Sequence, residues 1–147
     1  MKALVQRVHR ATVFVGETAH ASIGPGLLVF VGIERGDAGE DAAYLARKLA
    51  RIRVFEDARA KMSLNVSEIG GDILLVSAFT LLGQVRRGLR PDFTRAEEPG
   101  RAALLFDHLS ELLAREGATV RKGVFGAHMD IDCVNDGPVA ILIDTRE

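Results

Sequence analysis

Asn135-Asp136-Gly137-Pro138-Val139-Ala140 lies between two stretches of alternating character near the end of the chain. In residues 129–133 and again in residues 139–143, apolar side chains recur at every second position and share one face of an extended backbone. This alternation predicts β-strands, and Asn-Asp-Gly between two strands is typical of a turn. The stretch therefore predicts a closing hairpin, and with it a sheet that is at least partly antiparallel.

Gly137 and Pro138 make this turn unusual. Proline has no N–H to donate to a strand ladder, and it restricts the conformation of the residue before it. An X-Pro bond is also the place where a cis peptide costs only about 0.5–1 kcal/mol more than trans. Two interpretations remain open: a hairpin turn that happens to contain proline, or a rigid corner that presents carbonyl oxygens to a ligand.

The bulk composition describes an ordinary globular chain. Its 147 residues suit one domain over residues 1–147, with 48% hydrophobic residues, 27% charged residues and a net charge of −1. That charge argues against nonspecific coating of nucleic acid but leaves room for a local basic patch. Cys133 is the only cysteine, which excludes an internal disulfide and fits a reducing compartment. Without a signal-peptide core or a bilayer-long apolar run, we expect a cytoplasmic protein with no membrane partner.

Working outward from the final hairpin, hydrophobic periodicity predicts the remaining elements. Strands are predicted at 2–15 (with a bulge near 8–11), 20–23, 27–33, 72–79 and 119–124, and helices at 40–51 and 101–116. Residues 53–55 are predicted to be a short strand or the exit from the first helix. Residues 56–71 and 80–99 are predicted to be irregular, and the second of these is a long polar loop of the kind that is usually functional or disordered. The pattern predicts a mixed α/β fold in one domain.

The segment Ser77-Ala78-Phe79-Thr80-Leu81 ends a predicted buried strand and leads into that loop. Ligands often meet backbone N–H groups at the carboxyl ends of strands, although Phe79 could equally be a core residue and Thr80 a turn cap. The loop carries arginines and an aromatic residue. They are Arg86, Arg87, Arg90, Phe93 and Arg95. This composition suits either a solvated loop or a phosphate-contacting patch with an aromatic ring for stacking on a base.

Other kinds of site are less well supported. His128, Asp130 and Asp132 alternate along one strand face, which suits metal ligands but equally suits a face turned to solvent. The glycine spacings match neither a dinucleotide fingerprint nor a P-loop, and no serine lies in a Gly-x-Ser-x-Gly elbow. No metal site is therefore predicted.

Several segments together resemble the D-aminoacyl-tRNA deacylase family, in the same order and over essentially the whole chain. They are the opening Met1-Lys2-Ala3-Leu4-Val5-Gln6-Arg7-Val8, Arg53-Val54-Phe55-Glu56-Asp57 with Lys61-Met62, Ser77-Ala78-Phe79-Thr80-Leu81, Gly88-Leu89-Arg90-Pro91-Asp92-Phe93, and Gly126-Ala127-His128-Met129 leading to Asn135-Asp136-Gly137-Pro138-Val139. The resemblance implies a compact α/β domain with two main helices and a mixed or antiparallel, barrel-like sheet, which forms a homodimer.

The resemblance also implies an activity. Such enzymes hydrolyse the ester that joins a D-amino acid, or glycine on a mismatched tRNA, to the 3′ end of the tRNA, and they reject L-aminoacyl-tRNA. By that match, Gly137 and Pro138 form the chirality filter, with a cis peptide between them, and reach into the partner subunit's active site. Main-chain carbonyls at such a corner can accept hydrogen bonds from the substrate ammonium and occupy the space of an L side chain. No cofactor is expected, and DNA is not an expected partner.

The same match assigns roles at the strand end. Backbone N–H groups around Ala78, Phe79 and Thr80 are expected to stabilise the oxyanion, with Thr80 supporting rather than attacking. The resemblance favours the 2′-hydroxyl of the terminal adenosine as the activator. Phe79 is expected to help form the adenosine pocket, and Ser77 and Arg90 complete the expected substrate-binding set with Gly137 and Pro138.

Three positions depart from the family pattern: Ala78 replaces the usual Gln, Ala140 the usual Thr, and Ser63 the usual Asn. Neither alanine can donate or accept a hydrogen bond through its side chain. An alternative is therefore a relative that binds aminoacyl-tRNA with weak or lost hydrolysis.

Overall fold

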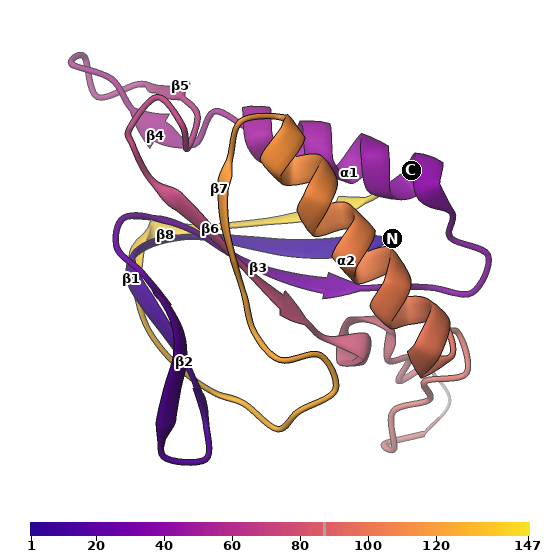
Figure 1. Cartoon of the computed structure of the whole chain (residues 1–147). Helices are drawn as coiled ribbons and strands as arrows, with labels where there is room; N and C mark the ends of the chain where they lie inside the picture. Colours follow the sequence, from indigo (N-terminus) through magenta and orange to yellow (C-terminus); the bar gives the residue numbers. More distant parts are fainter. Residues whose placement is uncertain (87) are drawn as a thin grey trace.

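The longest two strands are β1 (Lys2–Val15) and β8 (Asp130–Asp144), which pair antiparallel with each other over most of their length (Figure 1). This computed structural model describes residues 1–86 and 88–147. In the pairing of β1 with β8 the register shifts between Gln6 and Val8 and again between Val8 and Arg10. The irregularity predicted near residues 8–11 is thus confirmed.

The hairpin predicted at residues 135–140 is wrong, because β8 continues through that stretch as one strand. Asn135 pairs with Val8 and Ala140 pairs with Gln6, so residues 136–139 stand opposite Arg7 alone and form a bulge. The alternating flanks were correctly assigned as strands, but both pair with β1 instead of with each other. The turn-forming residues Asp136 and Gly137 therefore lie in a bulge of one continuous strand.

The parallel part of the sheet lies beside the other edge of β1. After β2 (Thr18–Ile23), strand β3 (Gly26–Gly32) pairs parallel with β6 (Asp72–Ser77), which pairs parallel with β7 (Thr119–Lys122). The resulting order is β2-β1-β3-β6-β7, with β8 on β1. The continuous apolar runs predicted for β3 and β6 are buried, as a strand covered on both faces requires.

Helices α1 (Gly39–Arg51) and α2 (Pro99–Arg115) pack together on one face of the sheet (Figure 1). Their apolar stripes bury Leu45 and Leu49 from α1 and Phe106 and Leu109 from α2. The α2 helix begins where the Glu98 side chain accepts hydrogen bonds from the first backbone N–H groups, with proline in the first turn. Both helices were predicted to within two residues of these bounds.

The opposite face of the sheet carries a second, smaller hydrophobic cluster. Met129 and Ile131 pack there against a cluster that includes Leu28, Leu74 and Val76. The domain is thus a single mixed α/β unit with two main helices, as predicted.

Three short elements complete the fold: β4 (Phe55–Glu56), β5 (Met62–Leu64) and the 3-10 helix η1 (Phe79–Leu82). The sequence left residues 53–55 as a short strand or a helix exit and missed β5 and η1, because elements of two to four residues carry no periodic signal. Within residues 1–86 and 88–147, no helix is long and apolar enough to cross a membrane.

Candidate active site at the end of β6

The chain turns sharply where β6 ends, and neighbouring backbone holds the turn in place. The Ala78 N–H donates to the carbonyl oxygen of Val31, 2.8 Å away, so the strand end stays attached to β3. Gly32 makes room for this turn, since an added Cβ would lie 3.2 Å from the Ala78 carbonyl oxygen. Beyond it, Phe79 and Thr80 begin η1 with exposed side chains.

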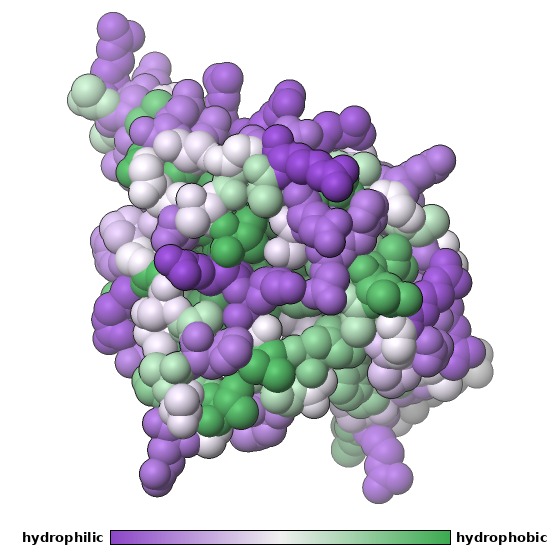
Figure 2. All heavy atoms as spheres, viewed as in Figure 1, coloured by the Kyte–Doolittle hydropathy of each residue, from purple (hydrophilic) through white to green (hydrophobic). Residues whose placement is uncertain are grey.

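A cavity of about 880 Å³ opens at this turn, and Ser77, Ala78, Phe79 and Thr80 all line it. The structure thus brings four predicted site residues to one place. The β7–β8 connection closes another side, and Figure 2 shows hydrophobic side chains at the surface over that connection, at the bottom of the view. A cavity with apolar walls and a few polar groups is the usual form of a ligand site.

Two aromatic rings stand together at the cavity. The rings of Phe79 and Phe93 meet edge to face, with centroids 5.1 Å apart and an interplanar angle of 75°. Phe79 is 59% exposed, so much of its ring is free to contact a ligand. Gly83 permits this pairing, because a Cβ there would lie 2.8 Å from Cε1 of Phe93.

The backbone N–H groups of Ala78, Phe79 and Thr80, which were predicted to stabilise an oxyanion, are not equally available to a ligand. The Ala78 N–H is already used in the bond to Val31. The N–H groups of Phe79 and Thr80 precede the first internal hydrogen bond of η1, from the Leu81 N–H to the Ala78 carbonyl at 3.1 Å. Of the three predicted donors, Phe79 and Thr80 are therefore the two available to a ligand.

The Gly137–Pro138 corner lies on the bulge of β8, exposed, with a cis peptide bond as the resemblance implies. Gly137 has a φ of 129°, a conformation that favours glycine. Sequence reasoning missed the residue that holds this corner, Arg7. Its Nε donates to the Asp136 carbonyl oxygen at 3.1 Å, and its Nη1 donates to the Val54 carbonyl oxygen at 2.6 Å.

The position of Arg7 in the alternating pattern of β1 could have predicted that its side chain is buried and paired. Its side chain is in phase with the buried Ala3 and Val5, and only 5% of Arg7 is exposed. A buried arginine needs hydrogen-bonded or charged partners. The Asp136 carboxylate supplies one, with its Oδ2 3.2 Å from Nε of Arg7.

Within one chain, the corner and the cavity lie apart. Ile131 lines the cavity, and Gly137 follows six residues later on the same strand. At roughly 3.3 Å per residue, that is on the order of 20 Å along the strand. The structure therefore does not bring the two halves of the predicted site together in a single copy.

The remaining candidates are less central. Arg90 is exposed and does not line the cavity, and Arg87 lies outside the described residues. His128 lines the cavity with a side chain that is 94% exposed, the Asp130 side chain is 78% exposed, and Asp132 pairs with Arg10 at 3.1 Å. In the described part of the chain, no group of three or more His, Cys, Asp or Glu residues could hold a metal ion.

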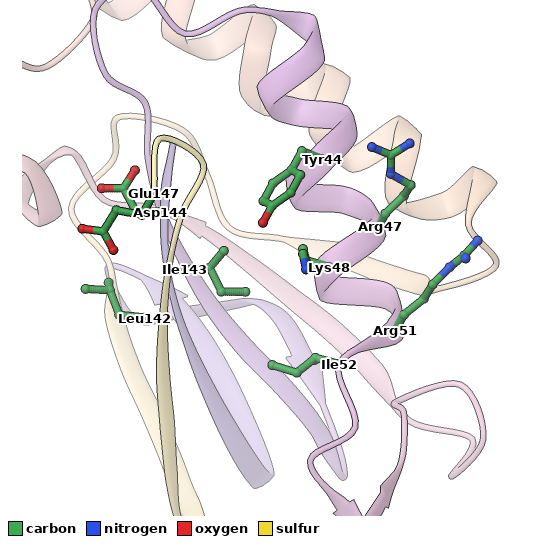
Figure 3. A pocket seen from close by; sticks show the side chains of 9 residues that line it. All are labelled: Tyr44, Arg47, Lys48, Arg51, Ile52, Leu142, Ile143, Asp144 and Glu147. Carbon is green, nitrogen blue, oxygen red and sulfur yellow. The ribbon is translucent and has the colours of Figure 1, made fainter.

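A second cavity, of about 800 Å³, lies between α1 and the end of β8 (Figure 3). Arg47 and Lys48 line it from the helix, and Leu142 and Asp144 from the strand. Asp144 also pairs with Lys2 at 3.1 Å. Because none of the predicted site residues lines this groove, we place the candidate site at the end of β6.

Known proteins resemble this chain over nearly its whole length. A family model described as D-Tyr-tRNA(Tyr) deacylase matches residues 4–144. A D-aminoacyl-tRNA deacylase from Anaeromyxobacter dehalogenans (strain 2CP-C) is 49% identical over 146 residues, which cover 99% of this chain and 98% of that protein.

Two solved structures have the same fold. One, described as c-Myc DNA Unwinding Element Binding Protein, superposes with a TM-score of 0.91 at 38% identity over 98% of both chains. The other, described as a probable eukaryotic D-amino acid tRNA deacylase, has a TM-score of 0.83 at 16% identity over 97% of both chains, so this likeness concerns the fold alone. Since the family model spans nearly the whole chain and a relative is 49% identical across it, the chain belongs to the D-Tyr-tRNA(Tyr) deacylase family.

Proposed function

We propose that this protein hydrolyses the ester bond of D-aminoacyl-tRNA, and of glycine on a mismatched tRNA, and rejects L-aminoacyl-tRNA. The observation that carries the proposal is the cavity at the end of β6, where Ser77, Ala78, Phe79 and Thr80 lie together in a chain of this family. The products are the free amino acid and tRNA.

The proposed reaction uses backbone groups and the RNA itself. Water attacks the ester carbonyl, the bond to the ribose oxygen breaks, and the proton passes to that oxygen. The N–H groups of Phe79 and Thr80 stabilise the negative charge that develops on the carbonyl oxygen. The 2′-hydroxyl of the terminal adenosine activates the attack, and Thr80 helps to position the reacting groups.

The terminal adenosine is proposed to bind at the aromatic pair of Phe79 and Phe93. Phe79 meets Phe93 edge to face and is 59% exposed at the cavity, so much of its ring is open to a base. Stacking on an aromatic ring is worth about 1–3 kcal/mol per base and tolerates any sequence. Ser77 lies at the same turn, and Arg90, which is exposed, is the proposed phosphate contact.

Chiral selection is assigned to the Gly137–Pro138 corner of a second copy of the chain. The corner is exposed, and neither Gly137 nor Pro138 lines the cavity of its own chain, so the proposal has a partner subunit supply it. The exposed apolar side chain of Phe79, which lines the cavity, also favours a cover from another molecule. Ala140 has no hydroxyl to bond to the corner, whereas Arg7 donates a hydrogen bond to the Asp136 carbonyl oxygen.

The alternative is a relative that binds aminoacyl-tRNA but hydrolyses it weakly, which Ala78 and Ala140 make conceivable. Hydrolysis of D-tyrosyl-tRNA and L-tyrosyl-tRNA, each with and without a chelator, tests both. Selective release of D-tyrosine at a rate the chelator does not change supports the proposal. Binding without release supports the alternative, and release abolished by the chelator indicates a metal-dependent hydrolase. A single-stranded DNA competitor that blocks binding as well as tRNA does would count against an aminoacyl-tRNA site.

A further inference from the structure

A buried carboxylate lies beside the candidate site and takes no part in the proposed chemistry. Glu34 follows β3 and is 2% exposed. Its Oε1 pairs with Arg95, and its Oε2 lies 3.2 Å from Nη1 of Arg146. Burying a charge is unfavourable unless partners compensate it, so this position calls for an explanation.

Contacts other than the one with Arg95 also hold Glu34 in place. Asp37, which is fully buried, accepts a hydrogen bond from the Glu34 backbone N–H at 2.7 Å. The same Asp37 accepts a bond from Nη2 of Arg146 at 2.9 Å. Glu34 therefore keeps a cationic neighbour and an ordered backbone even without Arg95.

Arg95 brings a separate segment of chain to this carboxylate. The Arg35 N–H donates to the Arg95 carbonyl oxygen at 2.9 Å, and the Glu97 N–H donates to the Ile33 carbonyl oxygen at 2.9 Å. Nε of Arg35 adds a bond to the Ala96 carbonyl oxygen at 3.1 Å. Residues 95–97 thus lie along residues 33–35, and the Glu34–Arg95 ion pair joins the two segments through their side chains.

That attachment sets one wall of the cavity. Phe93, Ala96 and Glu97 all line it, and the Ala96 N–H donates to the Phe93 carbonyl oxygen at 2.9 Å. Two residues beyond Phe93 toward the carboxyl end, the chain is tied to Glu34. Phe93 therefore precedes a segment that is held both by the backbone bonds between residues 95–97 and 33–35 and by the Glu34–Arg95 ion pair.

We propose that Arg95 is a positioning residue, which through its ion pair with Glu34 holds Phe93 against Phe79 and so sets the affinity of the cavity for the terminal nucleoside of tRNA. The inference rests on the proposed function, since it assumes that this nucleoside binds at the aromatic pair. Arg95 contacts neither the ester nor the donors at Phe79 and Thr80. Its loss should therefore weaken binding and leave the hydrolytic step nearly unchanged.

The test is the steady-state hydrolysis of D-tyrosyl-tRNA by Arg95→Gln, with Arg51→Gln as the matched control. Arg51 is also an exposed arginine in an ion pair, with Glu116 at 2.9 Å, and it does not line the cavity. We expect Arg95→Gln to raise KM about tenfold with kcat within about twofold of wild type, because only binding is lost. Arg51→Gln should leave both constants unchanged, and Arg95→Lys, which keeps the charge, should recover part of the loss.

A spectroscopic readout separates positioning from general destabilisation. The ring proton resonances of Phe79 and Phe93 should shift in Arg95→Gln and stay in place in Arg51→Gln, because neighbouring rings shift each other's resonances. A KM unchanged in Arg95→Gln, or a loss confined to kcat, would overturn the inference while the wild-type protein still hydrolyses D-tyrosyl-tRNA. If the wild type itself releases no D-tyrosine, the proposed function fails instead.

Discussion

Arg7 and Asp136 stand 129 residues apart in sequence and are joined at the bulge of β8, with Nε of the arginine 3.1 Å from the aspartate carbonyl oxygen. The same guanidinium donates to the Val54 carbonyl oxygen, so one buried side chain ties the corner to the segment that enters β4. The orientation of Gly137 and Pro138 therefore depends on a residue in the first strand.

Replacing Arg7 by lysine keeps the charge but loses the planar, multi-donor geometry. We expect a loss of about 1–3 kcal/mol in the free energy of unfolding, because a buried acceptor is left without its donor. Discrimination between D- and L-tyrosyl-tRNA should fall as well. Chemical denaturation and the ratio of kcat/KM for the two substrates measure these effects.

Arg10→Lys is the control, since Arg10 lies on the same strand and pairs with Asp132 on β8 at the surface. Its stability should change by no more than about 0.5 kcal/mol. Equal losses in the two variants would contradict a special role for Arg7.

Gly137→Ala should distort the corner, because the backbone has a φ of 129° and an added Cβ would lie 2.9 Å from the Val139 nitrogen. We expect a cost of order 1–3 kcal/mol in stability and a lower D/L ratio of kcat/KM. Gly16→Ala is the control, since Gly16 also has a positive φ but nothing within 4 Å of an added Cβ. An unchanged D/L ratio in Gly137→Ala would remove the corner from chiral selection.

Thr80→Ala should reduce kcat on D-tyrosyl-tRNA by no more than about tenfold, or ~1.4 kcal/mol, if the side chain only supports positioning. Thr18→Ala, which also removes an exposed threonine hydroxyl, should have no effect. Rapid quenching of the wild-type reaction followed by mass spectrometry checks for an acyl-enzyme. A trapped acyl group on Thr80, together with complete loss in the variant, would make this residue the nucleophile.

Ser63→Ala should raise the pKa of Asp57 toward its ordinary value of 3.8. In the folded protein the pKa of Asp57 is lowered by hydrogen bonds from the Ser63 hydroxyl and from the backbone N–H groups of Lys61 and Arg59. A lowered pKa in the folded state means a stabilising contribution that is complete above pH 3.8 and lost as the pH falls through the lower, folded value.

NMR titration of the Asp57 carboxyl in both proteins measures this shift directly. Ser67→Ala is the control, since its hydroxyl reaches only the Gly117 carbonyl oxygen, at 3.4 Å. An identical Asp57 titration with and without Ser63 would show that the backbone donors alone account for the lowered pKa.

Elements with a long periodic signal could be predicted from the sequence. The helices α1 and α2 and the buried strands β3 and β6 follow from local spacing, which a burial face imposes over many residues. The strand predicted at 72–79 extends two residues too far, past its end at Ser77, because Ala78 and Phe79 continue the apolar pattern although the chain already turns there.

Pairing partners could not be predicted in the same way. Alternation shows that residues 129–133 and 139–143 are strands, but it does not say that both pair with β1. Asn-Asp-Gly suits a bulge as well as a turn, which is why the hairpin was the wrong prediction. The contacts of Arg7 and Glu34 join segments far apart in sequence, and only the folded chain shows which donor meets which acceptor.

The single strand β8 carries Ile131 in its own cavity and Gly137 on the exposed bulge. If the bulge completes a neighbour's site, each β8 belongs to two catalytic centres at once. Consider a mixed dimer in which one chain carries Gly137→Ala and the other has a blocked cavity. The blocked cavity would then receive the altered corner, while the open cavity would receive the normal corner and stay intact. Subunit exchange between the two variants would thus restore one centre with normal activity and selectivity in each mixed dimer.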